Sequence, residues 1–519
     1  MTGFLRQTLS QLLEEINVIH TTGNLNIPIS GIAIDSRQVE SGNCFVALIG
    51  TSTDGHKYIQ TAIRNGATAV IGSQLGLQLN VPYIQVEDTR HTLALLSAAF
   101  YGFPARSLSV IGVTGTDGKT TSSNLIYQIL LAAGYRAGII STVNAIINNE
   151  ELDTGFHVTT PEAPDVQRYL TRMVTAGLTH VVLEATSHGL SQERVTGCEF
   201  DIGVVTNITH EHLDYHGTYE AYRAAKGRLF TNLLDTVEKQ SGNPRTAVLN
   251  LDDSSFDYLD SISPPQKLTY STKQKADFFT NEYYTLPAGT KFEVHSAQGD
   301  FLVESTLVGE YNIANCLAAI TATVGGLNIP IQAAQSGIAN LPGIPGRMQL
   351  INLGQDFTAI VDFAHTPNAL KHTLETARTL TKGKVIAIFG SAGLRDREKR
   401  RMMAETSADL ADISILTAED PRTESLAGIL AEMAKGAESH GAIEGKTFFR
   451  VPDRGEAIKT AVRMAQPGDL VIACGKGHEQ SMCFGETEYP WDDRTAMKSA
   501  LAELLGVTGA VMLKLPTSK

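Results

Sequence analysis

Short apolar runs separated by amphipathic stretches recur along the 519-residue chain. The runs "SVIGVTG", "THVVLEA" and "DIGVVTNI" are almost entirely apolar, as in strands buried on both faces, whereas "TTSSNLIYQILLAAGY" repeats apolar residues at helical spacing. Strands that alternate with helices predict parallel sheets of the α/β class. Such sheets bind ligands beyond the carboxyl ends of their strands.

Two breaks in this pattern predict three domains. A small α/β unit, with the runs "CFVALIG" and "VPYIQV", closes at "FPARSL", and the Pro/Gly-rich "ANLPGIPGRM" precedes a fresh set of strands from "TAIVDFA" to "LVIACG". The predicted boundaries are 1–107, 108–342 and 343–519, which agrees with ~150 residues per domain. We expect a central domain of the phosphate-loop NTPase type and a Rossmann-like C-terminal domain.

Composition excludes several classes of function. A net charge of -13 and a pI near 5.6 argue against a nucleic-acid binder, which needs clustered cations to displace counterions. No apolar run approaches the ~20 residues of a membrane helix, so neither membrane insertion nor secretion is expected. Five widely spaced cysteines are typical of reduced, buried thiols. The sequence therefore predicts a cytoplasmic protein.

The stretch "GVTGTDGKTT" predicts a nucleotide site. A Gly-rich turn between a strand and a helix offers backbone N–H groups to phosphate, Lys119 adds a cation, and Thr120 can hold Mg²⁺. The glycine spacing departs from the common phosphate loop, because Val113 stands five residues before Gly118. A plain strand-to-helix turn would explain the glycines but not Lys-Thr-Thr. The loop residues expected to bind nucleotide are Gly115, Thr116, Gly118, Lys119, Thr120 and Thr121.

Acidic and histidine residues follow two other predicted strands. Glu184 ends the strand of "VVLEATSHGLSQERV", where phosphate-loop proteins hold their metal from the far side, although an N-cap or surface acid is an equal alternative. The stretch "THEHLDYHG" supplies His210, Glu211, His212, Asp214 and His216. Each one alone is more often a solvated residue. Together with Glu184 and the loop they favour a second divalent metal, which could clamp a transferred phosphoryl group.

These stretches also carry a resemblance to a known family. In order along the chain they are "DSRQVESGNCFVAL", "TDGHKYI", "GVTGTDGKTT", "TTPE", "EATSHGLSQERV", "NITHEHLDYHGTYEAY", "AKGRLF", "GEYNIANCLAA", "PGRMQ", "VDFAHTPNAL", "RDREKR", "EDPR" and "GKGHE". The chain resembles the Mur ligases over nearly its whole length, and most of all their MurE branch. The resemblance implies three domains, the first binding the UDP end of the substrate, and an ATP-dependent ligation. In it the D-Glu carboxylate of UDP-MurNAc-L-Ala-D-Glu becomes an acyl phosphate that the amine of a diamino acid attacks.

The resemblance also assigns roles to individual residues. Lys119, Glu184, His212 and Lys226 match the catalytic set, and two magnesium sites are implied, with Thr120, Glu184, His212 and Lys226 as ligands. Lys226 matches a lysine that the family carbamylates to an N6-carboxylated form, which can bind a metal as a protonated lysine cannot. Asn312, Arg347 and Asp362 match contacts to ATP, and His365 lies in the same stretch. The residues matching contacts to the UDP-sugar peptide are Ser36, Thr159, Thr160, Ser187, Gln192 and Arg194.

Two positions depart from the family pattern. Asp117 stands in the phosphate loop where the family usually has Asn, which places a carboxylate beside the triphosphate. At 419–422 the chain reads Glu-Asp-Pro-Arg, where members that add meso-diaminopimelate resemble Asp-Asn-Pro-Arg. Arg422 or Arg395 could still pair with a carboxylate. Asp420 in place of the amide nevertheless favours an ammonium, and hence L-lysine or L-ornithine. The remaining matched contacts to the amino acid are Glu419, Gly475 and Glu479.

Three alternatives stay open at this point. The same reaction could use meso-diaminopimelate. A folylpolyglutamate synthetase shares the ATP site, but it would begin close to the phosphate loop. A nucleotide switch or scaffold that ligates nothing would leave Glu184, His212 and Lys226 unexplained as a set. The expected partners are UDP-MurNAc-L-Ala-D-Glu, ATP and a diamino acid, and the expected state is a monomer.

Overall fold

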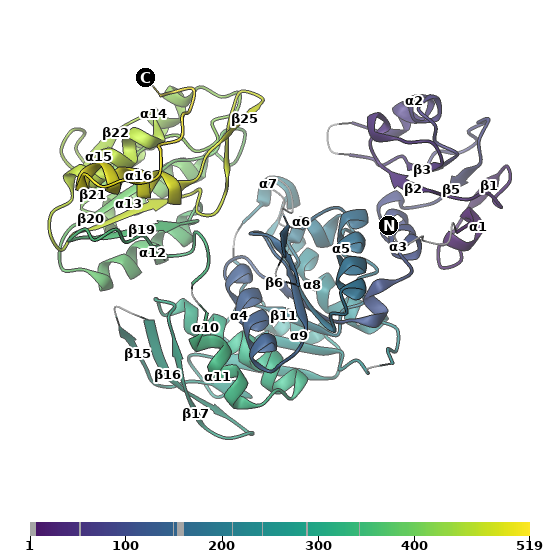
Figure 1. The fold of residues 1–519 in the computed structure, drawn as a ribbon, viewed down its shortest axis with the longest axis horizontal. Helices are drawn as coiled ribbons and strands as arrows, with labels where there is room; N and C mark the ends of the chain where they lie inside the picture. Colours follow the sequence, from purple (N-terminus) through teal and green to yellow (C-terminus); the bar gives the residue numbers. More distant parts are fainter. Residues whose placement is uncertain are drawn as a thin grey trace.

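The structure is a computed structural model of the whole chain, and it describes all residues except 1–6, 51–52, 149, 153–159, 210, 241, 287–288, 342 and 519. Three α/β bodies follow one another along the chain, with the central body between the N-terminal and C-terminal ones (Figure 1). Each body has its own sheet and its own hydrophobic core.

The N-terminal body is built on a five-stranded sheet of order β1-β5-β4-β3-β2, parallel except for β1 against β5. Its strands are β1 (His20–Thr22), β2 (Gly31–Ala33), β3 (Asn43–Val46), β4 (Ala69–Gly72) and β5 (Tyr83–Gln85). Its helices are α1 (Leu9–Leu12), α2 (Ile59–Arg64) and α3 (Thr89–Phe100), with 3₁₀ turns η1 (Ser36–Gln38), η2 (Gly55–Tyr58) and η3 (Pro104–Ser107). Helix α3 contacts the central body through α5 (Ala163–Thr175).

The middle of the central sheet is parallel, as the sequence predicts. Strands run in the order β14-β13-β12-β11-β6-β10-β7, all parallel, and carry the phosphate loop at the end of β6. Their bounds are β6 (Ser109–Thr114), β7 (Ala137–Ile140), β10 (His180–Glu184), β11 (Ile202–Val205), β12 (Thr246–Asn250), β13 (Lys267–Ser271) and β14 (Phe278–Phe279). A shared carboxyl edge therefore collects the residues that follow β6, β10 and β11.

Both edges of this sheet are antiparallel, which the prediction of a parallel sheet did not include. Strands β8 (Ala145–Ile147) and β9 (Glu150–Leu152) extend one edge, and β15 (Tyr283–Leu286), β16 (Gly289–Ser296) and β17 (Phe301–Ser305) extend the other. In β17 buried and exposed residues alternate, because one face of this edge meets solvent.

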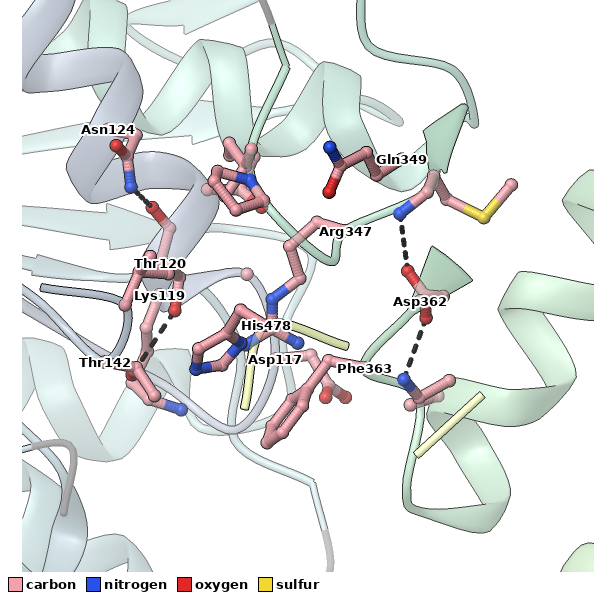
Figure 2. Close-up of a pocket in the computed structure, with 18 of the residues that line it drawn as sticks. Asp117, Lys119, Thr120, Asn124, Thr142, Arg347, Gln349, Asp362, Phe363 and His478 are labelled. Atoms are coloured by element: carbon pink, nitrogen blue, oxygen red, sulfur yellow. Dashed lines mark hydrogen bonds between the residues drawn. The ribbon is translucent and has the colours of Figure 1, made fainter. Parts of the chain in front are cut away.

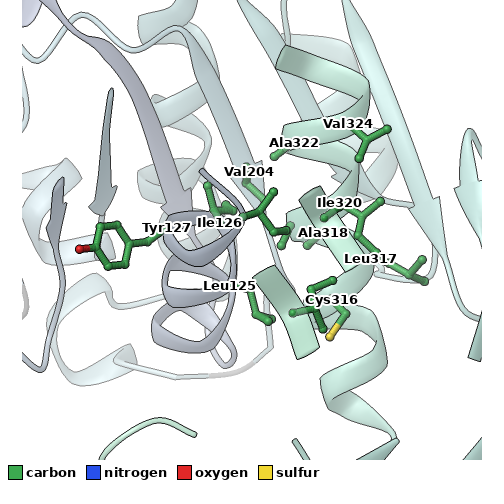
Figure 3. Packing of buried hydrophobic residues seen from close by; sticks show 14 of the residues in the cluster. Leu125, Ile126, Tyr127, Val204, Cys316, Leu317, Ala318, Ile320, Ala322 and Val324 are labelled. Atoms are coloured by element: carbon green, nitrogen blue, oxygen red, sulfur yellow. The ribbon is translucent and has the colours of Figure 1, made fainter. Parts of the chain in front are cut away.

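Helices cover both faces of the central sheet. They are α4 (Lys119–Ala132), α5, α6 (Ser187–Ser191), α7 (Leu213–His216), α8 (Tyr219–Asp235), α9 (Phe256–Ile262), α10 (Tyr311–Ile320) and α11 (Ile331–Ala339), with a π-helical turn η4 (Thr321–Gly325) that continues α10. Figure 3 shows Ile126 of α4 packed against the apolar face of α10. Gly337 lets α11 approach α4, since a Cβ there would lie 2.6 Å from the Ile129 Cα. This packing holds the C-terminal half of α4 against the sheet's other helices.

The C-terminal body has a six-stranded sheet of order β18-β19-β23-β20-β21-β22, parallel except for β18. The strands are β18 (Gln349–Leu350), β19 (Thr358–Asp362), β20 (Val385–Phe389), β21 (Ile413–Leu416), β22 (Phe448–Arg450) and β23 (Leu470–Cys474), and β24 (Ser481–Phe484) pairs with β25 (Thr487–Pro490). The helices are α12 (Pro367–Leu380), α13 (Glu398–Leu410), α14 (Leu426–Ser439), α15 (Arg454–Met464) and α16 (Asp493–Leu505).

Two expectations from composition can be compared with the structure. Of the five free cysteines, four are buried as expected, but Cys483 in β24 is partly exposed. Among the described residues, no helix is both long and apolar enough to span a bilayer.

Candidate functional site

A cavity of about 1710 Å³ lies between the central and C-terminal bodies. Its central wall includes Lys119, Thr120 and Glu184, and its C-terminal wall includes Arg347 and Asp362. In Figure 2 the side chain of Arg347 reaches across from the C-terminal side toward the phosphate loop. Residues more than 200 positions apart in the sequence thus line one space.

Two glycines of the phosphate loop leave room for close neighbouring side chains. Gly115 has φ +150° and Gly118 has φ +82°, and a Cβ at these positions would lie 1.8 Å from the Thr206 Oγ1 and 2.2 Å from the Asn315 Oδ1. Asn207, two residues after β11, binds the loop backbone on both sides of one residue. Its Oδ1 accepts a hydrogen bond from the Asp117 N–H at 3.0 Å, and its Nδ2 donates to the Asp117 carbonyl at 3.1 Å. Contacts with Thr206, Asn207 and Asn315 therefore set the conformation of the loop.

Glu184, a predicted ligand of the first metal ion, accepts hydrogen bonds from two threonines. The Thr120 hydroxyl donates to both carboxylate oxygens of Glu184 at 3.1 Å each, and Thr142 donates through its backbone N–H at 3.0 Å and its hydroxyl at 2.8 Å. Glu184 is 1% exposed. The Lys119 ammonium donates to the Thr116 carbonyl at 2.9 Å, which keeps it beside the loop.

Lys226 lies under the phosphate loop. It is 2% exposed, its ammonium donates to the Gly115 carbonyl at 2.5 Å, and it lies 4.6 Å from the centre of the Tyr222 ring. Burial, followed by the nearby Lys119 ammonium, holds the pKa of Lys226 well below its usual range. His212 lies on the same side of the site, with its ring 6.3 Å from that of Tyr222, and it has a left-handed φ of 54°. Within the described residues, no cluster of three His, Cys, Asp or Glu side chains could hold a metal.

The residues matched to the UDP-sugar peptide surround the end of β10. Thr160 donates to the Glu184 carbonyl at 3.1 Å, and Arg194 donates to the Thr160 carbonyl and to the Gln192 Oε1, each at 2.8 Å. Ser187 begins α6 and is buried. Ser36 lies apart from these residues, in η1 of the N-terminal body. Thr159 lies outside the described residues.

The residues matched to adenine and ribose come from two bodies. Asn312 on α10 accepts a hydrogen bond from the Asn315 Nδ2 at 3.0 Å, and Asn315 touches the loop beside Gly118. Asp362 accepts from the Met348 N–H at 2.7 Å and from the Ala364 N–H at 2.8 Å, which orders the segment that follows Arg347. His365 lies 3.9 Å from Glu211 across the gap between the bodies.

The residues matched to the diamino acid gather where β20, β21 and β23 end. Glu419 is 6% exposed, its Oε2 has no hydrogen-bond partner among the described residues, and burial raises its pKa. Its carboxylate lies against Gly475, where a Cβ would lie 2.3 Å from it. Asp420 accepts two hydrogen bonds from the Lys476 ammonium at 3.0 Å, and Lys476 also pairs with Glu479.

The two candidate carboxylate-binding arginines differ in surroundings. Arg422 is partly exposed, and in the part of the chain that the structure describes its guanidinium has no ion pair or hydrogen bond. Arg395 is exposed. Asp420 and Arg422 have left-handed φ values of 41° and 53°, which non-glycine residues rarely adopt and which cluster at functional sites.

Many residues that line the cavity were not predicted from the sequence, and four of them make notable contacts. Thr142 holds Glu184, Asn315 closes on the loop, and Phe363 stacks between the guanidinium of Arg347 (4.3 Å) and the His478 ring (4.9 Å). Thr142 has no sequence signal, because its role depends on a contact between distant segments, whereas Asn315 stands within the "GEYNIANCLAA" stretch. His478 stands within the "GKGHE" stretch and was passed over in favour of its neighbours.

The described residues fit ATP and magnesium. The loop has a glycine cradle that a Cβ would fill, a lysine beside it and a helix N-terminus behind it, as phosphate requires. Mg²⁺ usually takes only one or two protein ligands and completes its shell with water and phosphate, so Thr120 and Glu184 suffice for one ion.

Comparisons with known proteins agree with this geometry. Residues 28–101 match the model "Mur ligase family, catalytic domain", residues 113–323 match "Mur ligase middle domain", and residues 346–477 match "Mur ligase, glutamate ligase domain". The chain belongs to the Mur ligase family. Members of this family are ATP-dependent, ADP-forming amide ligases of peptidoglycan synthesis, so the predicted class of enzyme and the three-domain α/β fold are confirmed.

Individual relatives match over nearly their full length. The chain is 42% identical over 488 residues to the UDP-N-acetylmuramyl-tripeptide synthetase of Roseiflexus sp. (strain RS-1), covering 92% of this chain and 96% of the relative. It is 38% identical to the UDP-N-acetylmuramoyl-L-alanyl-D-glutamate--2,6-diaminopimelate ligase of Geobacillus thermodenitrificans (strain NG80-2), covering 93% and 97%. A solved structure of a protein with that second description is 33% identical, with TM-score 0.67, and 97% and 100% of the two chains are covered. Within the Mur ligase family, the chain thus groups with the tripeptide-forming branch.

Proposed function

We propose that this chain joins a diamino acid to the D-Glu carboxylate of UDP-MurNAc-L-Ala-D-Glu, with ATP as the energy source, in cytoplasmic peptidoglycan precursor synthesis. The observation that carries the proposal is the single cavity in which Lys119, Thr120 and Glu184 face Arg347 and Asp362. The names of the full-length relatives support the same reaction.

The described groups suit an acyl-phosphate route. A carboxylate is a poor acyl donor, and its phosphorylation supplies a leaving group. Lys119 and Arg347 place cations on two sides of the cavity, where the charge of the transferred phosphoryl group develops. Thr120 and Glu184 would hold magnesium, which would supply further positive charge to the phosphoryl group. The peptide contacts around Thr160 and Arg194 lie directly beyond the Glu184 strand, so the acceptor carboxylate can lie near the same loop.

The test is phosphate release by the purified protein with ATP, Mg²⁺ and UDP-MurNAc-L-Ala-D-Glu, with each diamino acid added separately and the product weighed by mass spectrometry. A product heavier by one diamino acid supports the proposal. If the UDP-peptide binds and no amine is ligated, the amine assignment is wrong. If the UDP-peptide does not bind, the proposed substrate itself is wrong. Light scattering in the same buffer tests our default expectation of a monomer.

We further propose that Lys226 is carbamylated and serves, with His212, as a ligand of a second magnesium ion. Carbamylation requires a neutral amine that can attack CO₂, and the lowered pKa of Lys226 supplies one. The product places an anion beside the Lys119 ammonium, so attraction replaces the repulsion that lowers the pKa of the unmodified Lys226.

For the amine, we propose L-lysine or L-ornithine. Relative to an amide at 420, Asp420 makes the group of Glu419, Lys476, Glu479 and Arg422 one charge more negative. That surplus favours a substrate side chain that ends in an ammonium without a second carboxylate. A second candidate, meso-diaminopimelate, is favoured by the guanidinium of Arg422, which has no described partner and could pair with a distal carboxylate. The parallel assays above separate the two.

A further inference from the structure

The carboxylate of Asp117, in the phosphate loop, contacts the C-terminal body. The backbone of Asp117 is held by Asn207 and by the Thr206 hydroxyl, which donates to the Asp117 carbonyl at 2.6 Å. Its Oδ2 accepts a hydrogen bond from the Asn368 Nδ2 at 3.5 Å, the outer limit for such a contact. Asp117 and Asn368 lie 251 positions apart, so this contact joins two bodies of the fold.

Charged side chains of opposite sign also face each other across this boundary. On the central side, Asp117 and Glu211 are acidic, and on the C-terminal side, Arg347 and Lys399 are cations that act electrostatically on them. Figure 2 shows the guanidinium of Arg347 directed toward Asp117. Glu211 also lies 3.9 Å from His365. Burial raises the pKa of Asp117, as does Glu211, while Lys119, Asn368 and Arg347 act in the opposite direction.

We propose that Asp117 is a positioning residue: through Asn368 it holds the C-terminal body against the phosphate loop, so that Arg347 and Asp362 reach a nucleotide bound at Lys119. The inference rests on the proposed function, because it concerns the same ATP site. Asp117 itself needs no contact with the nucleotide. Asn368 lies in the first turn of α12, so the helix holds its amide in place against Asp117. Asp362 ends the strand that precedes the same helix, so a contact at Asn368 also positions Asp362.

A charge swap tests this proposal. Asn368→Asp places two carboxylates face to face, and we expect the KM for ATP to rise about tenfold, as for a contact coupling near the middle of the usual range. Small-angle X-ray scattering should show a larger radius of gyration, because repulsion moves the bodies apart. The double variant Asp117→Asn, Asn368→Asp restores one donor and one acceptor, and both values should return to within about twofold of the original.

The controls separate a positioning role from a structural one. An acid in the first turn of α12 is favourable for the helix, so Asn368→Asp should melt normally. Asn340→Asp, the same substitution at an exposed site on the central body, should change neither the KM for ATP nor the scattering. The proposal is overturned if Asn368→Asp leaves the KM for ATP and the radius of gyration unchanged. It is also overturned if the double variant does not restore these two values. Failure of the proposed function would instead appear as absence of ligation by the unaltered protein, and the scattering comparison does not depend on ligation.

Discussion

Thr120 and Glu184 meet in a symmetrical contact, in which one hydroxyl lies 3.1 Å from each of the two carboxylate oxygens. Thr120 stands at the start of α4 and Glu184 at the end of β10, so the contact joins two neighbouring elements at the carboxyl edge of the sheet. Both side chains are almost fully buried. The magnesium ion proposed for this place would compete with this contact for the same hydroxyl and carboxylate oxygens.

Glu184→Gln should therefore impair magnesium use more than folding. The amide keeps the volume and one acceptor but removes the charge, so we expect kcat to fall by about 10²- to 10³-fold, and the Mg²⁺ concentration for half-maximal turnover to rise. The melting temperature should shift by a few degrees at most. Steady-state phosphate release across a Mg²⁺ titration measures the effect, with the exposed Glu238→Gln as a matched control. An unchanged Mg²⁺ dependence would remove Glu184 from the metal site.

Lys226 gives a prediction that depends on dissolved CO₂. If its carbamate is the active form, ligation should fall severalfold in CO₂-depleted buffer and recover when bicarbonate is added. Protein equilibrated with ¹³C-bicarbonate should show a carbamate carbon signal that Lys226→Gln abolishes.

A second buried lysine provides the control for Lys226. Lys239 is ion-paired with Asp201 at 2.6 Å and donates to the Leu108 carbonyl at 2.9 Å, so its nitrogen is engaged by fixed acceptors. Lys239→Arg should keep the ¹³C signal. A signal that survives Lys226→Gln would place the modification elsewhere.

His180 makes stability depend on pH. Burial lowers its pKa from 6.5 to about 4, and its ring packs 4.3 Å from that of Tyr135. The unfolded chain binds a proton below pH 6.5 that the folded chain refuses until about pH 4, so stability falls as the pH drops through this window. After allowance for partial exposure, the loss should be about 1 to 2 kcal/mol.

Unfolding by urea at several pH values measures this loss, followed through the transition of the central body. His180→Gln should flatten the profile between pH 6.5 and 4, whereas the exposed His20→Gln should leave it unchanged. If both variants retain the original slope, another group controls acid stability.

What the sequence could predict follows from the range of the interactions. The phosphate loop, its strand and α4 are local, and Glu184 was found because it ends a strand of five residues. Thr142 could not be found, since it meets Glu184 only through the pairing of β7 with β10, in which Ile140 lies opposite Leu183. The strength of a local pattern says nothing about which distant segment will complete a site.

The direction in which a side chain points cannot be read from the sequence either. Asp117 stands where the family usually has Asn, and the sequence could not show that its carboxylate, which lines the same cavity as Lys119, also contacts Asn368 in another body. Lys226 would be read from sequence as a solvated helix lysine, and only the fold shows it buried under Gly115. The antiparallel edges of the central sheet were not predicted for a related reason: a strand with one exposed face, such as β17, lacks the continuous apolar run that marks the middle strands.

Asp420→Asn should change the choice of amine. The substitution removes one negative charge beside Lys476, which keeps its pairing with Glu479, and so lowers the attraction for a substrate ammonium. We expect the ratio of kcat/KM for L-lysine or L-ornithine to that for meso-diaminopimelate to fall about tenfold. Competition between the amines, with products resolved by mass spectrometry, measures this ratio directly. The surface substitution Asp409→Asn, which removes the partner of His440, should leave it unchanged. A ratio that Asp420→Asn does not alter would mean that Arg422, and not the acidic group, selects the substrate, and a wild-type preference for meso-diaminopimelate would point the same way.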